Sequence, residues 1–128
     1  MKYYINKIIN LPFEEVEEKV TEALKSEGFG VLTEINVKEV FKKKLDVDFQ
    51  KYKILGACNP HFAHKALASE NKIGTMLPCN VILQQLPDGT TEVAAVDPKA
   101  SMMAVENENL AKLATAVADK LHRVIEQL

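Results

Sequence analysis

The hydrophobic and polar positions along the chain follow different periods in different segments, and each period predicts one kind of element. In residues 13–27 and again in residues 110–128, apolar side chains recur every three or four positions, as in amphipathic helices. Pro12 suits the first helical position of the earlier segment, and Gly28 follows it where a helix end favours glycine. These two segments are predicted to be the main helices of the fold.

Strand-like patterns separate the helical segments. They are short runs rich in β-branched and aromatic residues, bounded by Gly, Pro, Asn or Asp. The predicted strands are residues 3–8, 29–37, 52–58, 81–86 and 92–96. The turn Pro87-Asp88-Gly89 lies between the last two, so we expect these strands to form an antiparallel hairpin.

Two shorter helices complete the predicted order. Residues 38–45 indicate a short basic helix, whose inward side is expected to consist of Val40, Phe41 and Leu45. Asn59 and Pro60 fit the N-cap and first turn of a helix that reaches about residue 69. The order β-α-β-α-β-α-β-β-α favours a single α+β domain over residues 1-128, with a mostly antiparallel sheet and its helices packed on one face.

The composition is that of an ordinary globular domain. The 128 residues are 47% hydrophobic and 27% charged, with a formal net charge of −2. The only basic run, Lys42-Lys43-Lys44, is short and reads as a solvated helix face, so no nucleic-acid partner is expected. The chain has no apolar stretch near the roughly 20 residues of a membrane span, and its first residues do not resemble a signal peptide. With two cysteines in such a chain, we expect a cytoplasmic protein without a membrane partner.

The candidate reactive and metal-binding residues lie in residues 56–80, which hold both cysteines and two of the three histidines. His61 and His64 are spaced to share one face of the predicted helix, with Cys58 just before its N-terminus. Cys79 joins them if its strand pairs beside the strand that ends at Cys58. Cys58, His61, His64 and Cys79 then make a tetrahedral donor set for Zn²⁺, although their spacing matches no zinc-finger signature. Zinc is therefore a candidate cofactor that we do not favour.

The same cysteines allow two other interpretations. A helix N-terminus beside Cys58 would favour its thiolate, and Cys79 could resolve it through a disulfide, as in a thiol-dependent redox protein or enzyme. Cysteine also packs as a small buried hydrophobe, and this structural role is the interpretation that we favour. His61 and His64 would then be exposed helix residues.

A few other polar and sulfur-containing residues allow a chemical or a structural role. Asp97 precedes Pro98, which is typical of a turn rather than of a ligand-binding carboxylate. Asn59 is interpreted as a cap residue whose side chain binds backbone N–H groups. Met102 and Met103 either line an apolar pocket or fill gaps in the core, and we favour the core.

Several stretches of the chain also carry a resemblance to a known family. They are YKILGACNP at residues 52–60, AHKAL at 63–67, IGTMLPCNVIL at 73–83, and Asp97-Pro98 followed by Met102. In these stretches the chain resembles the family known as domain of unknown function 302, and residues 11–45 look like that family's opening helix and second strand. The resemblance implies a TATA-binding-protein-like α+β fold, bacterial or archaeal relatives and a homodimer. It implies shared shape and no particular activity.

We therefore expect a small non-catalytic domain that binds a ligand, acts as a sensor or mediates assembly. The candidate ligands are a small molecule, a metal ion and a partner protein, held in an apolar cleft with residues 58–80 at its mouth. The alternatives are a thiol-dependent redox protein or enzyme centred on Cys58 and Cys79, and the Zn²⁺ site described above. Assembly would be homodimerisation through an exposed strand edge or the long last helix.

Overall fold

The five strands form one antiparallel sheet, in the order β1-β5-β4-β3-β2, in the computed structural model, which describes residues 2–128. The strands are β1 (Tyr4–Ile9), β2 (Gly30–Asn36), β3 (Tyr52–Cys58), β4 (Cys79–Gln85) and β5 (Thr91–Val96). The predicted hairpin joins β4 to β5, with Gly89 at a φ of 88° in its turn. The predicted α+β fold and its antiparallel sheet are thus confirmed, and every neighbouring pair of strands is antiparallel.

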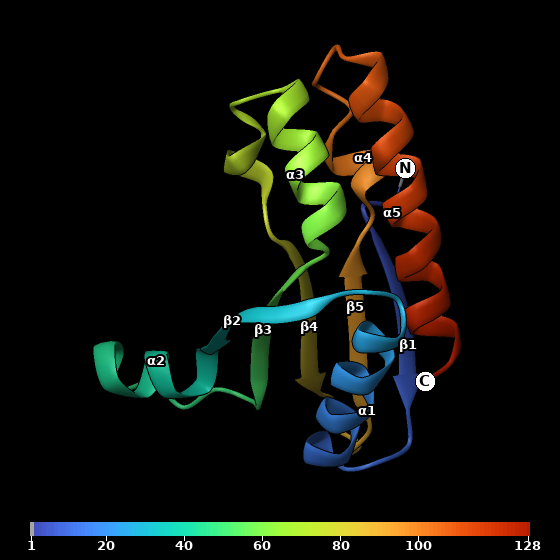
Figure 1. Ribbon diagram of the computed structural model, residues 1–128. Coiled ribbons are helices and arrows are strands. Elements are labelled where there is room, and N and C mark those ends of the chain that lie inside the picture. The colour runs from blue at the N-terminus through green and yellow to red at the C-terminus, as the bar shows by residue number, and fades with distance from the viewer. Residues whose placement is uncertain (1) are drawn as a thin grey trace.

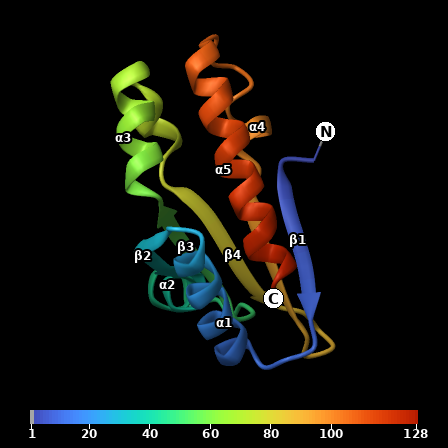
Figure 2. The same cartoon turned by 45° about the vertical axis from the view of Figure 1, so that its right-hand side comes forward.

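Two long helices cover one face of the sheet, a short helix extends from one edge, and the other helices lie beyond the ends of the strands (Figures 1 and 2). The helices are α1 (Phe13–Ser26), α2 (Val37–Leu45), α3 (Pro60–Ser69), α4 (Pro98–Ser101) and α5 (Glu108–Glu126), with a short 3₁₀ helix, η1 (Ile73–Met76). Both η1 and α4 lie in connections for which the sequence predicts no defined helix. Within residues 2–128, no helix combines the length and the apolar character needed to cross a membrane.

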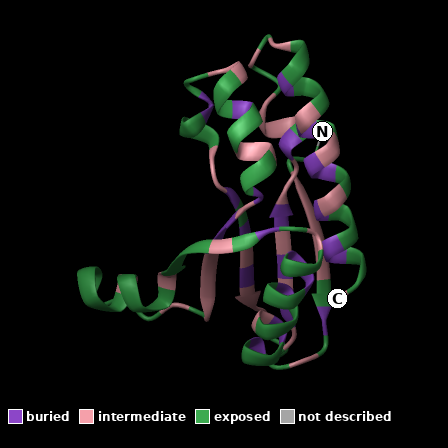
Figure 3. Cartoon of the chain, in the orientation of Figure 1, coloured by how far each residue is buried: buried purple, intermediate pink, exposed green. Residues whose placement is uncertain are grey.

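Helices α1 and α5 bury the main core against the sheet (Figure 3). Alternate residues of the central strands point to this side, so Leu55, Val81, Leu83 and Val93 are fully or almost fully buried. The helices meet them with Val16, Val20, Leu24, Leu121, Val124 and Ile125. Burial of each such side chain stabilises the fold by about 1.5–3 kcal/mol, which makes this layer the main source of stability.

A second, smaller hydrophobic cluster lies beyond the ends of the strands. Its buried members are Ala66 of α3, Ile73 of η1 and Leu110 of α5. Half-buried side chains pack around them: Leu77, Met102, Val105 and Leu113. Since Leu110 and the core residues of α5 lie on one helix, α5 connects the two clusters.

Helix α2 departs from the expectation for residues 38–45. None of its nine described residues is buried, and Val40 and Leu45 are 43% and 65% exposed. Only Val37 and Phe41 are half-buried, and the ring of Phe41 lies 5.1 Å from that of Phe49. The predicted inward packing of Val40 and Leu45 is wrong because β2 is the edge strand, so α2 continues past the sheet and not over the face that α1 covers.

Gly56 of β3 lies where three segments approach closely. A Cβ atom at this position would be 2.7 Å from Pro78 Cγ and would overlap the hydroxyl of Thr33 on β2. Both neighbours belong to chain segments held by sheet pairing, since Gly56 is opposite Thr33 on one side and Asn80 on the other. Only glycine fits here without moving the backbone next to the β3–α3 junction.

We predict that Gly56→Ala lowers the free energy of unfolding by about 1–3 kcal/mol, the usual cost of overpacking a tight site. Denaturant unfolding followed by circular dichroism measures this change. Gly30→Ala is the matched control, because a Cβ atom at Gly30 on neighbouring β2 has no neighbour within 4 Å among the described residues. Equal stability of the two variants would contradict the packing argument.

Candidate functional site

An apolar cavity of about 40 Å³ lies between α3 and α5, at the ends of β3 and β4. Its floor is made of buried residues: Phe29, Ala57, Asn59, Ala66, Cys79, Pro98, Leu110, Ala114 and Val117. Its rim is half-buried: Cys58, Phe62, Ala63, Leu77, Pro78, Met102 and Leu113. A buried floor and a half-buried rim mean that the cavity reaches the surface between the two helices.

The two cysteines predicted as a candidate site both line this cavity. Antiparallel pairing of β3 with β4 places Cys79 opposite Ala57, the residue before Cys58. Both thiols are free, Cys58 half-buried and Cys79 only 8% exposed. The structure therefore confirms that the strands bring the two cysteine positions side by side, without a disulfide between them.

Burial sets the protonation state of Cys79. Loss of hydration, and to a smaller extent the charge of a neighbouring Cys58 thiolate, raises the pKa of Cys79 from 9.0 to about 11. At neutral pH this thiol is protonated, whereas nucleophilic attack and metal ligation both need the thiolate. Cys79 therefore behaves as a small apolar side chain with a weak S–H donor.

The histidines predicted to join the cysteines lie elsewhere. His61 and His64 share one side of α3, as their spacing indicates, but that side is exposed and contributes nothing to the cavity. The inward side of α3 consists of Phe62, Ala63 and Ala66. No group of three or more His, Cys, Asp or Glu side chains in residues 2–128 is placed to hold a metal ion. The zinc set Cys58, His61, His64 and Cys79 is thus not assembled in this structure.

Asn59 differs from the cap residue that the sequence predicts. It occupies the N-cap position of α3, but its side chain makes no capping hydrogen bond. Its Nδ2 instead donates to Glu27 O at 3.4 Å, beside Gly28, whose φ is 86°. Its Oδ1 is buried and has no hydrogen-bond partner within residues 2–128. The prediction that Asn59 occupies the N-cap position was correct. The predicted capping hydrogen bond was wrong, because the side-chain amide binds the turn after α1 instead.

Two further predictions concern the C-terminal half. Asp97 caps α4 through a hydrogen bond from Lys99 N to Oδ1 at 3.0 Å, which confirms its turn role. Met102 lines the cavity, whereas Met103 is 68% exposed, so neither simply fills the core. Sequence reasoning missed the alanines that make room for the cavity, although Ala63 and Ala66 on α3 recur at helical spacing.

The fold and the cavity define a class of protein: a small α+β domain with one helix-covered sheet face and an apolar cavity at the strand ends. The chain belongs to the family described as domain of unknown function DUF302, whose model matches residues 5–128. It is similar to the crystal structure of the uncharacterized conserved protein DUF302 from Bacillus stearothermophilus, with a TM-score of 0.92 and 27% identity over 99% of this chain and 98% of that one. No functionally curated protein matches the chain. The family resemblance is confirmed, and these findings assign no activity.

We predict that Cys79 makes stability depend on pH in the alkaline range. Between pH 9 and about 11 the unfolded chain loses the Cys79 proton while the folded protein keeps it, so the free energy of unfolding falls as the pH rises. The slope is at most about 1.4 kcal/mol per pH unit. Urea unfolding across this range measures it.

Cys79→Ala should remove this component of the slope, while the tyrosines and lysines still titrate in both proteins. Cys58→Ala keeps the buried thiol and is expected to retain most of the fall. Parallel stability curves for the wild type and Cys79→Ala would show that burial does not hold the proton on Cys79.

Proposed function

We propose that the protein is a non-catalytic assembly domain that forms a homodimer through α2 and the adjoining uncovered face of the sheet. The observation that carries the proposal is the distribution of exposed hydrophobic side chains. Ten large hydrophobic residues are exposed within residues 2–128, and five of them fall between residues 32 and 47: Leu32, Ile35, Val40, Leu45 and Val47. Such a concentration on one edge of a small domain marks an interaction surface.

Two of these exposed residues, Ile35 and Val40, line an apolar groove of about 500 Å³ between α2 and the sheet. Its lining comes from α2, from the segment after it and from the outer sides of β2 and β3: Ile35, Val37, Val40, Phe41, Phe49, Tyr52 and Ile54. A nine-residue helix is only marginally stable by itself in water, and most helices gain their stability from packing an apolar side. α2 has that apolar side, and its own chain covers little of it.

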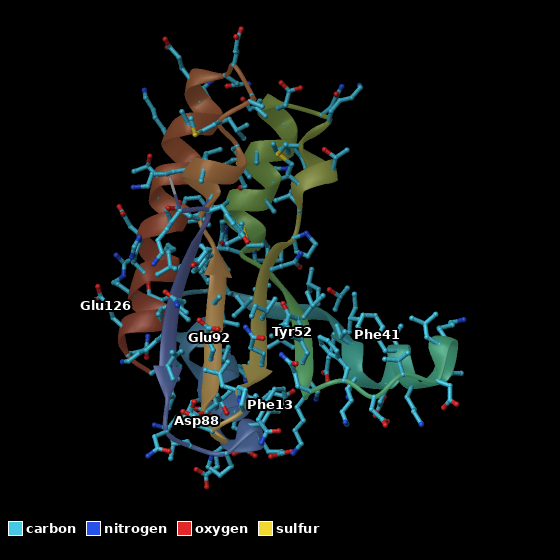
Figure 4. All side chains as sticks on the ribbon, turned by 180° about the vertical axis from the view of Figure 1, so that it is seen from behind. Phe13, Phe41, Tyr52, Asp88, Glu92 and Glu126 are labelled. Carbon is cyan, nitrogen blue, oxygen red and sulfur yellow. The ribbon has the colours of Figure 1, made fainter. Side chains whose placement is uncertain are left out.

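Elsewhere on the uncovered face, apolar side chains such as Tyr4, Ile82 and Val96 surround a polar centre at Glu92. Figure 4 views the sheet from this side, with Tyr52 and Glu92 on the strands and Phe41 on α2. Glu92 accepts hydrogen bonds from Asn6 Nδ2 at 2.8 Å and from Gln84 Nε2 at 2.9 Å. If a second protein covered this face, the Glu92 carboxylate would lose its hydration while its hydrogen-bond partners are neutral amides, which costs free energy. This favours an interface centred on the α2 groove rather than on β1 and β5.

A second copy of the chain suits the groove because the surface has both a recess and a protrusion. α2 extends away from the sheet edge in Figure 1, and the groove lies beside it. In a two-fold arrangement, each α2 can pack its apolar side into the groove of the partner, so the same residues serve both subunits. The homodimer is also what the family resemblance leads us to expect.

A non-catalytic role and a cytoplasmic location are parts of the same proposal. Burial raises the pKa of Cys79 and keeps its thiol protonated, and the exposed imidazoles of His61 and His64 lie outside the cavity. This arrangement supports the structural interpretation of Cys79 over the thiol-dependent one. Both cysteines are free, which supports a reducing compartment such as the cytoplasm.

The direct test is the mass in solution. Light scattering after size exclusion should give twice the monomer mass of 14.3 kDa at micromolar concentrations. Val40→Glu should weaken the dimer about 100-fold, which corresponds to about 2.7 kcal/mol, because it places a charge in the apolar contact. Sedimentation over a concentration series gives the dissociation constants.

Leu67→Glu is the matched control, since Leu67 on α3 is 43% exposed, as Val40 is, and lies outside the groove. It should leave the dissociation constant unchanged. Two results would refute the proposed interface: a wild-type protein that stays monomeric at about 100 micromolar, or a dimer that Val40→Glu leaves intact.

A further inference from the structure

The cavity between α3 and α5 separates the two hydrophobic clusters. Phe29, Ala57, Cys79 and Val117 belong to the main core, and Ala66 and Leu110 belong to the smaller cluster. Small side chains create the space, because Ala63 and Ala66 on α3 face Ala114 on α5 across it. Protein interiors are normally close-packed. A cavity that lies between two clusters and opens at a half-buried rim departs from this packing.

One polar residue of the cavity lining has a buried atom without a partner. Asn59 is only 8% exposed, and its Oδ1 receives no hydrogen bond from any described residue. Its Nδ2 donates to Glu27 O, so the carbonyl end of the amide is the end that lacks a partner. A buried carbonyl without a donor is unfavourable, and native proteins usually satisfy it with a water molecule or a ligand.

We propose that this cavity is a binding site for a small neutral molecule with an apolar body and one hydrogen-bond donor, which Asn59 Oδ1 accepts. A hydroxyl or an amide N–H is the donor that fits. The occupant completes the packing between the two clusters and satisfies Asn59 in the same step. The proposal concerns the interior between α3 and α5 and is independent of self-association through α2.

The lining selects the class of ligand. No charged side chain from residues 2–128 lines the cavity, so an ionised group would lose its hydration there without compensation. Neutral Cys79 and the surrounding Phe, Leu, Met and Val side chains favour an apolar body. The acceptor specifies that the polar end of the ligand must donate, which excludes ethers and esters of the same size.

The volume limits how much of the ligand is enclosed. A water molecule needs about 10–15 Å³ measured in this way, so about 40 Å³ takes about three non-hydrogen atoms. The remainder of a longer molecule lies at the rim, between Phe62 of α3 and Leu113 of α5. The smaller cluster has only three buried residues, so local opening around it gives the ligand a route to the floor.

Two isomers test the requirement for a donor. Butan-1-ol carries a hydroxyl, and diethyl ether has the same atoms and accepts hydrogen bonds without donating them. Titration of each into the ¹⁵N-labelled protein, followed by amide chemical shifts, should show saturable shifts at residues of α3 and α5. We expect butan-1-ol to bind at least tenfold more tightly than the ether.

Variants locate the binding in the cavity. Ala114→Leu adds three carbon atoms, enough to fill the enclosed space, and should abolish the saturable shifts. Ala111→Leu is the matched control, because Ala111 is exposed on the same helix and does not line the cavity; it should bind as the wild type does. Asn59→Leu should remove the preference for the alcohol.

Each other outcome would overturn the proposal. If neither isomer gives saturable shifts, the cavity holds water only. Equal affinities for the two isomers would exclude Asn59 Oδ1 as a selective acceptor. Binding that survives Ala114→Leu would place the ligand elsewhere, and this result stands even if Asn59→Leu fails to fold.

Discussion

The packing of α5 against one face of the antiparallel sheet is the interaction on which the rest of the structure depends. Its C-terminal half supplies Leu121, Val124 and Ile125 to the main core, and its first turn supplies Leu110 to the smaller cluster. One continuous helix therefore holds both clusters at a set separation. The cavity exists because the residues of α5 between them, including Ala114, are too small to close the gap to α3.

Coverage of a single sheet face has a second consequence on the opposite side. A sheet with one covered face leaves the alternate residues of every strand facing out, and here Glu92 pairs with the amides of Asn6 and Gln84 on this face. Burial, together with Tyr3 and Glu92, raises the pKa of Tyr52 on this face. Half of the exposed large hydrophobic side chains of residues 2–128 lie in or beside α2, where the chain leaves the edge of the sheet. The internal cavity and the surface that we propose for self-association therefore lie in different parts of the fold.

The junction between β3 and α3 shows how one residue can serve a site instead of a helix. Asn59 stands at the N-cap, where its side chain would normally bind the first backbone N–H groups. It reaches instead toward Glu27 and Gly28 at the end of α1 and leaves its carbonyl oxygen facing no donor in the described chain. The N-terminus of α3 therefore lacks this capping hydrogen bond, and Asn59 Oδ1 is left for the ligand that we propose for the cavity.

The sequence by itself determined the five strands and the four longer helices in their order, because helical periodicity, alternation and turn residues such as Pro87-Asp88-Gly89 act over a few neighbouring positions. It also identified the two cysteine positions that the sheet brings together. Tertiary structure alone decided that α2 leaves its apolar side uncovered and that Asn59 Oδ1 has no partner within the described residues. It also bore out the exposed positions of His61 and His64 that the sequence favoured over a metal site. Each of these features depends on contacts between segments that are distant in the sequence, such as those set by the edge position of β2 and by the turn after α1. Patterns over a few neighbouring residues do not encode such contacts.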